Sequence, residues 1–131
     1  MRILVAGLAA LCAAPALAET PAAPEVYACR MVQGCSAGGT CDDMGDSGPV
    51  LQVTIEPGGK AIVDDGRQSY EMSALVELGV GRNWLLEAPG QGIGLVTLSP
   101  DNTIMVGTGH ELRNGTLGTS SMRAECTPGN G

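Results

Sequence analysis

The sequence predicts an all-β domain: a small antiparallel meander of about eight strands, closed into a barrel or folded as a sandwich, with two disulfides. Three observations support this. Short apolar runs alternate with turn residues along most of the chain. The connections between the runs are too short for the crossovers that parallel strands need. An even number of cysteines follows an export signal.

The clearest strand lies within 49–56, where Leu51, Val53 and Ile55 alternate with polar residues, as in a half-buried strand. Residues 69–78 show the same period of two, although 73–78 is also compatible with a short helix. Asn114-Gly115, between two runs, is a strong signal for a hairpin turn. The other strands are expected at 26–32, 60–63, 84–88, 93–98, 103–112 and 116–124, with a long loop over 33–48.

The first eighteen residues have the pattern of a secretory signal peptide. A positive start at Arg2 precedes the apolar run 3–14, and 16–18 has the small-x-small pattern that signal peptidase reads. This apolar run is too short to span a membrane. Lipidation of Cys12 is the alternative, but Leu11 stands before it, where a small residue is usual. We therefore expect cleavage between Ala18 and Glu19, which releases a periplasmic or secreted chain.

The remainder divides into a Pro- and Ala-rich disordered lead (19–25), a single β-domain (26–127) and a flexible tail (128–131).

Fourteen acidic and seven basic residues give a net charge of −7, and loss of Arg2 makes it about −8. This charge argues against nucleic acid and against anionic membrane surfaces. No second apolar segment suggests membrane insertion. Aromatic residues are scarce, so Trp84 is expected to pack in the core or at a barrel end.

The four remaining cysteines are expected to pair as Cys29–Cys126 and Cys35–Cys41. In a meander that closes, the first strand lies beside the last, so the first pair would fasten the seam. The second pair would lie within the loop 33–48. The two other pairings would tie the chain ends together only through that flexible loop. Zinc is not expected, because the cysteine spacings lack paired C-x-x-C motifs and the chain has a single histidine.

The segment Gly45-Asp46-Ser47-Gly48-Pro49 resembles the GDSGGP segment around the nucleophile of chymotrypsin-like serine proteases, with one glycine missing. By that resemblance Ser47 would be the nucleophile. That family places its His and Asp before the Ser, whereas His110 follows it here. A serine without a positioned base is a weak nucleophile. We therefore expect a plain Gly/Asp/Ser loop that enters a strand.

Three further patterns are also expected to be structural. Asp42, Asp43 and Asp46 lack the Gly and Glu positions of an EF-hand loop, so a solvated acidic loop is expected. Gly90–Gly94 leads into a strand and not into a helix, which removes the argument for phosphate binding. His110 is expected to be packed or hydrogen-bonded. We assign no catalytic, cofactor-binding or metal-binding residue.

A non-enzymatic protein-binding module, such as an inhibitor of an envelope or secreted hydrolase, is the expected function. Small disulfide-bonded β-barrels, including periplasmic lysozyme inhibitors, act in this way, which is an analogy of fold only. The alternative is a carrier of a small apolar ligand inside the barrel, and the third possibility is an enzyme. A pocket of several hundred cubic ångströms favours a carrier, whereas an exposed apolar patch favours a binder. The sequence indicates neither the partner nor the oligomeric state.

Overall fold

The computed structural model describes residues 20–75, 80–88 and 92–129. Its elements, in chain order, are β1 (Glu25–Cys35), β2 (Cys41–Asp43), the 3₁₀ turn η1 (Gly45–Ser47), β3 (Val50–Ile55), β4 (Ala61–Asp64), β5 (Ser69–Ala74), β6 (Arg82–Ala88), β7 (Gly92–Leu98), β8 (Ile104–Arg113) and β9 (Thr116–Pro128).

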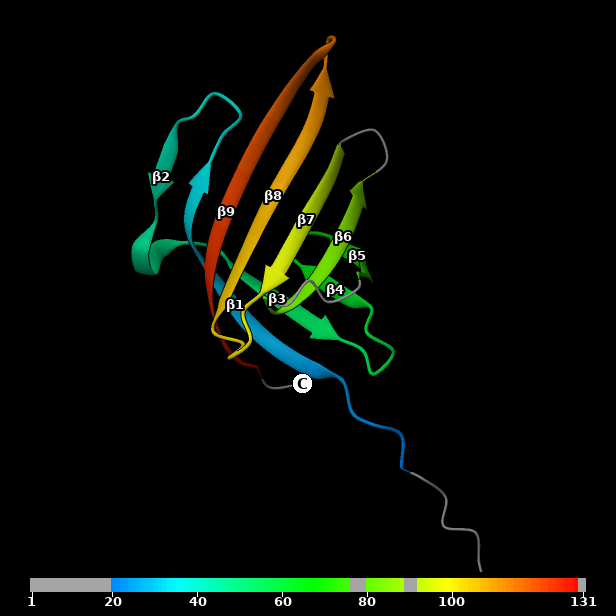
Figure 1. The fold of residues 1–131 in the computed structure, drawn as a ribbon. Coiled ribbons are helices and arrows are strands. Elements are labelled where there is room, and N and C mark those ends of the chain that lie inside the picture. The colour runs from blue at the N-terminus through cyan, green and yellow to red at the C-terminus, as the bar shows by residue number, and fades with distance from the viewer. Residues whose placement is uncertain (1–19, 76–79, 89–91, 130–131) are drawn as a thin grey trace, which may run out of the picture.

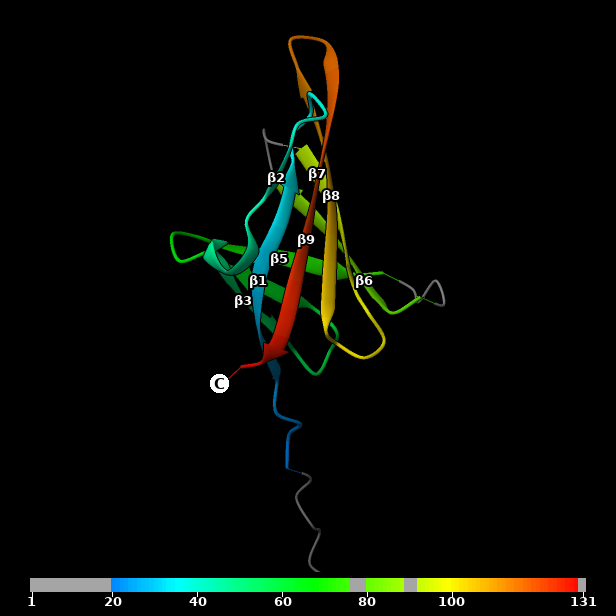
Figure 2. The same cartoon turned by 90° about the vertical axis from the view of Figure 1, so that its left-hand side faces the viewer.

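Eight of these strands form a closed antiparallel barrel, which confirms the predicted fold class (Figure 1). Strands β3 to β9 follow one another as neighbours in chain order, and β1 closes the sheet by pairing with both β3 and β9. The β8–β9 hairpin is the longest and projects beyond the rest of the barrel (Figure 2). Strand β2 is additional, and it pairs only with the last residues of β1.

A register shift in β1, between Met31 and Gln33, lets this strand serve two partners. Before the shift, residues 25–30 pair with β3, and after it, residues 33–35 pair with β2. Strand β9 pairs with β1 on both sides of the shift. Because such a bulge bends a strand and increases its twist, the end of β1 turns away from β3 and carries β2 with it.

Inward and outward side chains alternate along the strands, and the inward ones form the core. Leu51, Val53 and Ile55 point inward from β3, as the sequence predicts. The largest side chains among the fully buried residues are those of Met72, Leu98, Met105, Val53 and Cys29. Trp84 is also buried, and its Nε1 donates a hydrogen bond of 2.8 Å to the carbonyl oxygen of Gly59. The prediction that Trp84 packs in the core is confirmed.

Both predicted disulfides, Cys29–Cys126 and Cys35–Cys41, are present. In each pair the two cysteines lie directly opposite each other on neighbouring antiparallel strands. Two details of the prediction are wrong. Cys126 lies within β9 and does not follow the last strand, and Cys35 and Cys41 belong to β1 and β2 and not to a loop.

The prediction of a long loop over 33–48 is therefore wrong for most of these residues. It contains the end of β1, a tight turn, β2 and η1. The turn is held by backbone hydrogen bonds from Ser36 to Thr40 and from Gly39 to Ser36, with N···O distances of 2.8 and 2.9 Å. These residues are short and polar, so they show no alternation that would reveal a strand.

Other boundaries also differ from those expected. Strand β1 begins at Glu25, within the expected lead, and β9 continues to Pro128. Ser73 and Ala74 belong to strand β5, so the alternative of a helix over 73–78 is wrong where it can be compared. The expected continuation to residue 78, the signal peptide with its cleavage site at Ala18–Glu19, and part of the tail lie outside the described residues.

Candidate functional site

Five large apolar side chains are exposed on the outer surface of β7, β8 and β9, where a soluble barrel usually carries polar groups. We call this set the apolar face: Ile93, Leu95, Val106, Leu112 and Leu117, with exposed fractions of 53, 40, 43, 70 and 67%.

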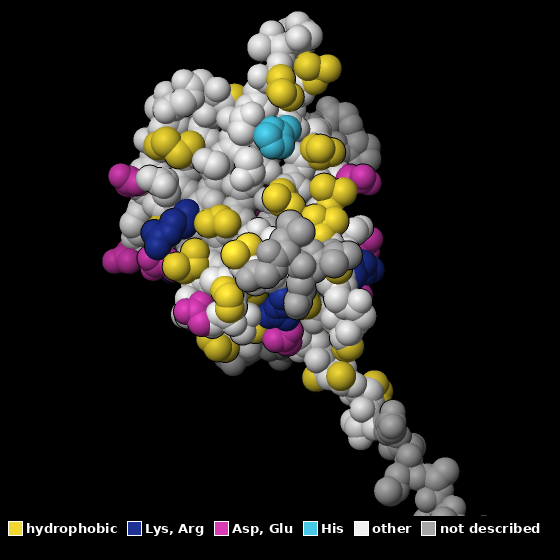
Figure 3. Space-filling model, in the orientation of Figure 1, with side chains coloured by type: hydrophobic (Ala, Val, Ile, Leu, Met, Phe, Trp, Pro, Cys, Tyr) yellow, Lys and Arg dark blue, Asp and Glu magenta, His cyan; other side chains and the backbone are white. Residues whose placement is uncertain are grey.

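Between β7 and β8, Ile93, Leu95 and Val106 lie opposite His110, Thr108 and Thr97, so no two of these three apolar residues are direct cross-strand partners. Leu112 and Leu117 are directly opposite each other at the tip of the β8–β9 hairpin. Asn114 and Gly115 form the turn between them with positive φ angles of 49° and 76°, as the predicted hairpin requires. Figure 3 shows hydrophobic side chains on both sides of the histidine, toward the hairpin tip and toward the middle of the barrel.

His110 lies between the two ends of the apolar face. Its cross-strand neighbours are Ile93 on β7 and Thr119 on β9. The side chain is exposed, and Thr119 Oγ1 lies 3.2 Å from its Nδ1, which is a hydrogen-bonding distance. The expectation of a hydrogen-bonded histidine is confirmed, although this residue lies on the outside of the barrel and not in its core.

A hollow of about 270 Å³ opens at the end of the barrel beside the apolar face, and we call it the mouth cup. Residues from five successive strands line it, among them Tyr70, Leu86, Gly94, Gly109, Glu111 and Ser120. Four of these form one continuous row across β6 to β9, because Leu86 pairs with Gly94, Gly94 with Gly109, and Gly109 with Ser120. The two adjacent glycines leave the middle of this row without side chains.

Two further hollows lined by described residues lie elsewhere. One of about 290 Å³ lies beside β1, β3 and β4 and is lined by Val26, Val50 and Gln52 among others. Another, of about 270 Å³, lies at the end of the barrel opposite the mouth cup, beside Trp84 and Leu75. Their volumes lie close to the lower end of the range for sites that hold drug-sized ligands, about 300–1,000 Å³. The described core side chains, Met72, Leu98 and Met105 among them, pack into one cluster.

At that opposite end, Arg82 connects two distant parts of the chain. Its Nη1 donates to a carboxylate oxygen of Glu25, and its Nη2 donates to Asn102 Oδ1 at 2.7 Å. The guanidinium carbon also lies 5.9 Å from the centroid of the Trp84 ring. The hydrogen bond from Arg82 holds the pKa of Glu25 below its ordinary value, since it favours the charged carboxylate.

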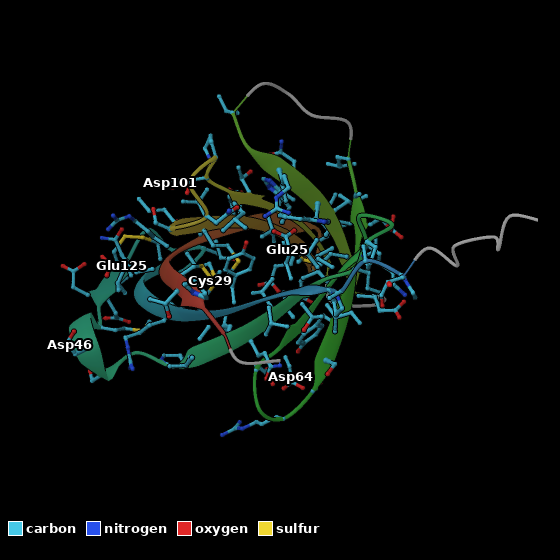
Figure 4. All side chains as sticks on the ribbon, turned by 90° about the horizontal axis from the view of Figure 1, so that it is seen from below. Glu25, Cys29, Asp46, Asp64, Asp101 and Glu125 are labelled. Atoms are coloured by element: carbon cyan, nitrogen blue, oxygen red, sulfur yellow. A yellow bond between two sulfur atoms is a disulfide. The ribbon has the colours of Figure 1, made fainter. Side chains whose placement is uncertain are left out.

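The segment that resembles a protease motif is a folded turn on the outside of the barrel. Ser47 Oγ donates a hydrogen bond of 2.7 Å to the carbonyl oxygen of Met44. Arg30 holds the same turn, because its Nη1 donates to the carbonyl oxygens of Asp46 and Gly48 at 2.7 and 3.1 Å. In Figure 4, Asp46 lies at the periphery, far from the labelled Cys29 of the barrel wall. The arrangement is that of a structural loop.

The acidic residues of this region also have structural contacts. Asp43 Oδ1 accepts a hydrogen bond of 3.0 Å from Gln33 across the β1–β2 pair. Among residues 20–75, 80–88 and 92–129, no group of three or more His, Cys, Asp or Glu side chains is arranged to hold a metal. Within the same ranges, no helix is long and apolar enough to cross a membrane.

Sequence reasoning missed both the apolar face and the mouth cup. The alternation within β7 and β8 is visible in the sequence, but both faces of these strands carry apolar residues or glycine, so the pattern does not say which face is outside. Comparison with known proteins adds no further constraint, since no family model, curated protein or solved structure matches the chain.

Proposed function

We propose that this protein is an exported protein-binding module, which holds a partner protein against the apolar face. The supporting observation is the cluster of five exposed apolar side chains on three adjacent strands. Contiguous apolar surface of this kind marks interaction sites on soluble proteins. The packed cluster of described core side chains favours this function over that of an apolar-ligand carrier.

Charge suggests what kind of partner fits. The chain carries a net charge of −7, and opposite charge speeds and orients protein association. Beside the apolar face, Thr108, His110, Thr119 and Ser121 are outward on β8 and β9, while Glu87 lies opposite Ile93 and Arg123 lies opposite Val106. We therefore expect a basic partner with an apolar contact surface, which associates more slowly as salt concentration rises. A basic hydrolase of the envelope or of the extracellular space fits this description.

The two disulfides indicate an oxidising compartment, which agrees with export. The proposed signal peptide makes this testable. The protein recovered from the envelope or the medium should have an intact mass that begins at Glu19, reduced by four hydrogens for the two disulfides. A mass that includes residues 1–18 would contradict cleavage at this site.

The binding proposal is tested by capture of envelope proteins from the native organism on immobilised mature protein. A captured protein is then purified, and its affinity is measured with three forms of this chain. Leu112→Ser/Leu117→Ser removes two of the five apolar side chains and is expected to weaken binding at least tenfold. Val50→Ser is the matched control, because Val50 is an exposed apolar residue of β3, outside the apolar face.

Equal binding by Leu112→Ser/Leu117→Ser and by the native chain would contradict the proposal. Sedimentation of the native chain alone tests the other possible occupant. If the chain dimerises at micromolar concentration and Leu112→Ser/Leu117→Ser does not, the apolar face is an interface between two copies and not a site for another protein.

A further inference from the structure

We propose that the Cys35–Cys41 disulfide is a site of reversible thiol exchange, at which a dithiol reductant releases β2 and loosens the tip of the β8–β9 hairpin. The two cysteines lie directly opposite each other on β1 and β2. The effect on binding rests on the proposed function, because Leu112 and Leu117 at that tip belong to the apolar face. The exchange itself can be tested without any partner.

The two disulfides differ in their exposure to solvent. Cys41 is exposed and Cys35 is half-buried, whereas Cys29 and Cys126 have exposed fractions of 0 and 6%. In thiol–disulfide exchange a thiolate must reach one of the two sulfur atoms, so the rate depends on access. We therefore expect a reductant to open Cys35–Cys41 while Cys29–Cys126, which fastens β1 to β9, stays closed.

The exposed Cys41 is the expected point of attack. A thiolate of the reductant bonds to Cys41 Sγ, the disulfide breaks, and Cys35 leaves as a thiolate that takes up a proton. The second thiol of the reductant then loses its proton and attacks the reductant's own sulfur in this mixed disulfide. Cys41 leaves as a thiolate and is protonated in turn, and the reductant becomes a disulfide. Two electrons have then passed to the two cysteines, and an excess of a small-molecule disulfide reverses both steps.

Strand β2 depends on this bond more than the other strands of the sheet do. It has three residues, all of them exposed, and among the described strands it pairs only with β1. Burial of apolar surface therefore contributes little to its stability. An isolated two-stranded hairpin is at best marginally stable in water.

The turn η1, which follows β2, is held independently of the disulfide. Arg30 donates hydrogen bonds to the carbonyl oxygens of Asp46 and Gly48, and the backbone N–H of Met44 donates to that of Val32. Reduction should therefore release residues 36–43 and leave η1 in place.

The turn between β1 and β2 lies beside β9, below the tip of the β8–β9 hairpin (Figure 1). A Cβ added at Gly118 would lie 2.9 Å from Ala37 Cβ, so this turn packs directly on β9 at the glycine. Because successive residues of a strand point to opposite faces, Ala37 supports the hairpin on the face opposite to that of Leu117. Release of β2 removes this support. The tip is then less ordered in the free protein, and ordering it on binding costs affinity.

The first experiment measures the exchange itself. The purified mature protein is treated with dithiothreitol, free thiols are trapped with N-ethylmaleimide, and peptide mapping follows the labelling of each cysteine. Cys35 and Cys41 should be labelled at least tenfold faster than Cys29 and Cys126. Equal rates, or faster labelling of Cys29 and Cys126, would overturn the proposal.

Amide hydrogen exchange tests the structural consequence. Two proteins are compared with the native chain: the form alkylated only at Cys35 and Cys41, and the variant Cys35→Ser/Cys41→Ser. Both should exchange faster at residues 36–43 and 112–118. If the variant does not fold, the alkylated form decides alone. Native exchange at 112–118 in that form would overturn the link between the disulfide and the hairpin tip.

Asp43→Ala is the matched control. It removes the hydrogen bond that Gln33 donates to Asp43 across the same two strands, but it keeps the disulfide. Its exchange at 112–118 should be that of the native chain. An increase as large as that of the alkylated form would show that any disturbance of β2 has this effect, which would overturn a specific role for the disulfide.

Partner binding separates this proposal from the proposed function. The form alkylated at Cys35 and Cys41 should bind the captured partner at least threefold more weakly than the native chain. Equal affinity would overturn the regulation, even where Leu112→Ser/Leu117→Ser has lost the partner as the proposed function expects. If that leucine variant binds like the native chain, the proposed function has failed, and the labelling and hydrogen-exchange experiments still decide on the exchange site.

Discussion

Arg82 on β6 forms an ion pair with Glu25, the first residue of β1, and the two residues are 57 positions apart in the chain. The pair anchors the start of the first strand to the opposite wall of the barrel. Tyr27 strengthens it, because its hydroxyl donates a hydrogen bond of 3.0 Å to the other carboxylate oxygen of Glu25.

Glu25→Gln should lower the free energy of unfolding at pH 7 by about 0.2–1 kcal/mol, the usual range for a solvent-exposed pair. Because the folded-state pKa of Glu25 is held below its ordinary value of 4.5, the stabilisation is complete above that value. It is lost as the pH falls through the lower, folded-state pKa. Urea titrations at pH 7 and at pH 2.5 should therefore show a difference between variant and native protein that shrinks in acid.

Glu71→Gln serves as the control for this titration. Glu71 pairs with Lys60, and in this pair the Glu71 side chain is more exposed than that of Glu25 and the Lys60 side chain more exposed than that of Arg82. Its substitution should change stability less than that of Glu25. A difference between Glu25→Gln and native protein that stays constant from pH 7 to 2.5 would mean that the ion pair contributes nothing to the pH dependence.

The two disulfides should contribute unequally to stability. Their sequence separations are 97 and 6 residues. On the chain-entropy estimate, the closed loops of about 98 and about 7 residues, counted with both cysteines, are worth about 4.7 and about 2.4 kcal/mol. Cys29→Ser/Cys126→Ser should therefore lower the free energy of unfolding by more than Cys35→Ser/Cys41→Ser, as measured by chemical denaturation. The reverse order would show that the seam bond does not dominate.

Trp84→Phe should destabilise the barrel by about 1–3 kcal/mol, because it removes a buried hydrogen-bond donor and leaves the Gly59 carbonyl without this partner. Met72→Leu is the control for general disturbance of the core, because it nearly conserves side-chain volume at a buried position and removes no hydrogen bond. It should lower the free energy of unfolding by less than about 1.5 kcal/mol. Far-ultraviolet circular dichroism is the suitable readout, because Trp84 is the only tryptophan of the chain. Equal losses in both variants would argue against a role for the hydrogen bond.

Ser47 should not react with a fluorophosphonate probe. Its hydroxyl donates to a backbone carbonyl, and no base accepts its proton. Gel fluorescence after incubation of the mature protein with the probe measures this directly. Labelling that disappears in Ser47→Ala, with Ser36→Ala as a control, would reopen the enzyme hypothesis.

The sequence was sufficient for those parts of the fold that leave a periodic or topological signal. Alternation identified the inward residues of β3, and Asn114-Gly115 identified the hairpin. The pairing of Cys29 with Cys126 followed from the closure of a meander, since its first and last strands must meet. Strand β2 left no such signal, because its three residues are all exposed and polar or disulfide-bonded.

The candidate site was harder to predict for a different reason. Part of the wall of the mouth cup is glycine, and Gly94 and Gly109 leave no hydrophobic period to detect. The apolar face depends on which side of β7 and β8 is outside. Only the registers with β6 and β9 decide this, as they bring Val96 and Met105 to the core and leave Leu95 and Val106 exposed.

The closure of the barrel by its first and last strands has a consequence for how the chain folds. A polypeptide that emerges N-terminus first presents β1 long before β9 (Thr116–Pro128) exists to pair with it. Until those thirteen residues arrive, the edges of β1 and β8 that β9 will cover have unpaired backbone groups, which readily join other chains. Closure over so long a sequence separation is also slow. The C-terminal tenth of this protein therefore controls both the moment of folding and the time during which the chain needs protection from aggregation.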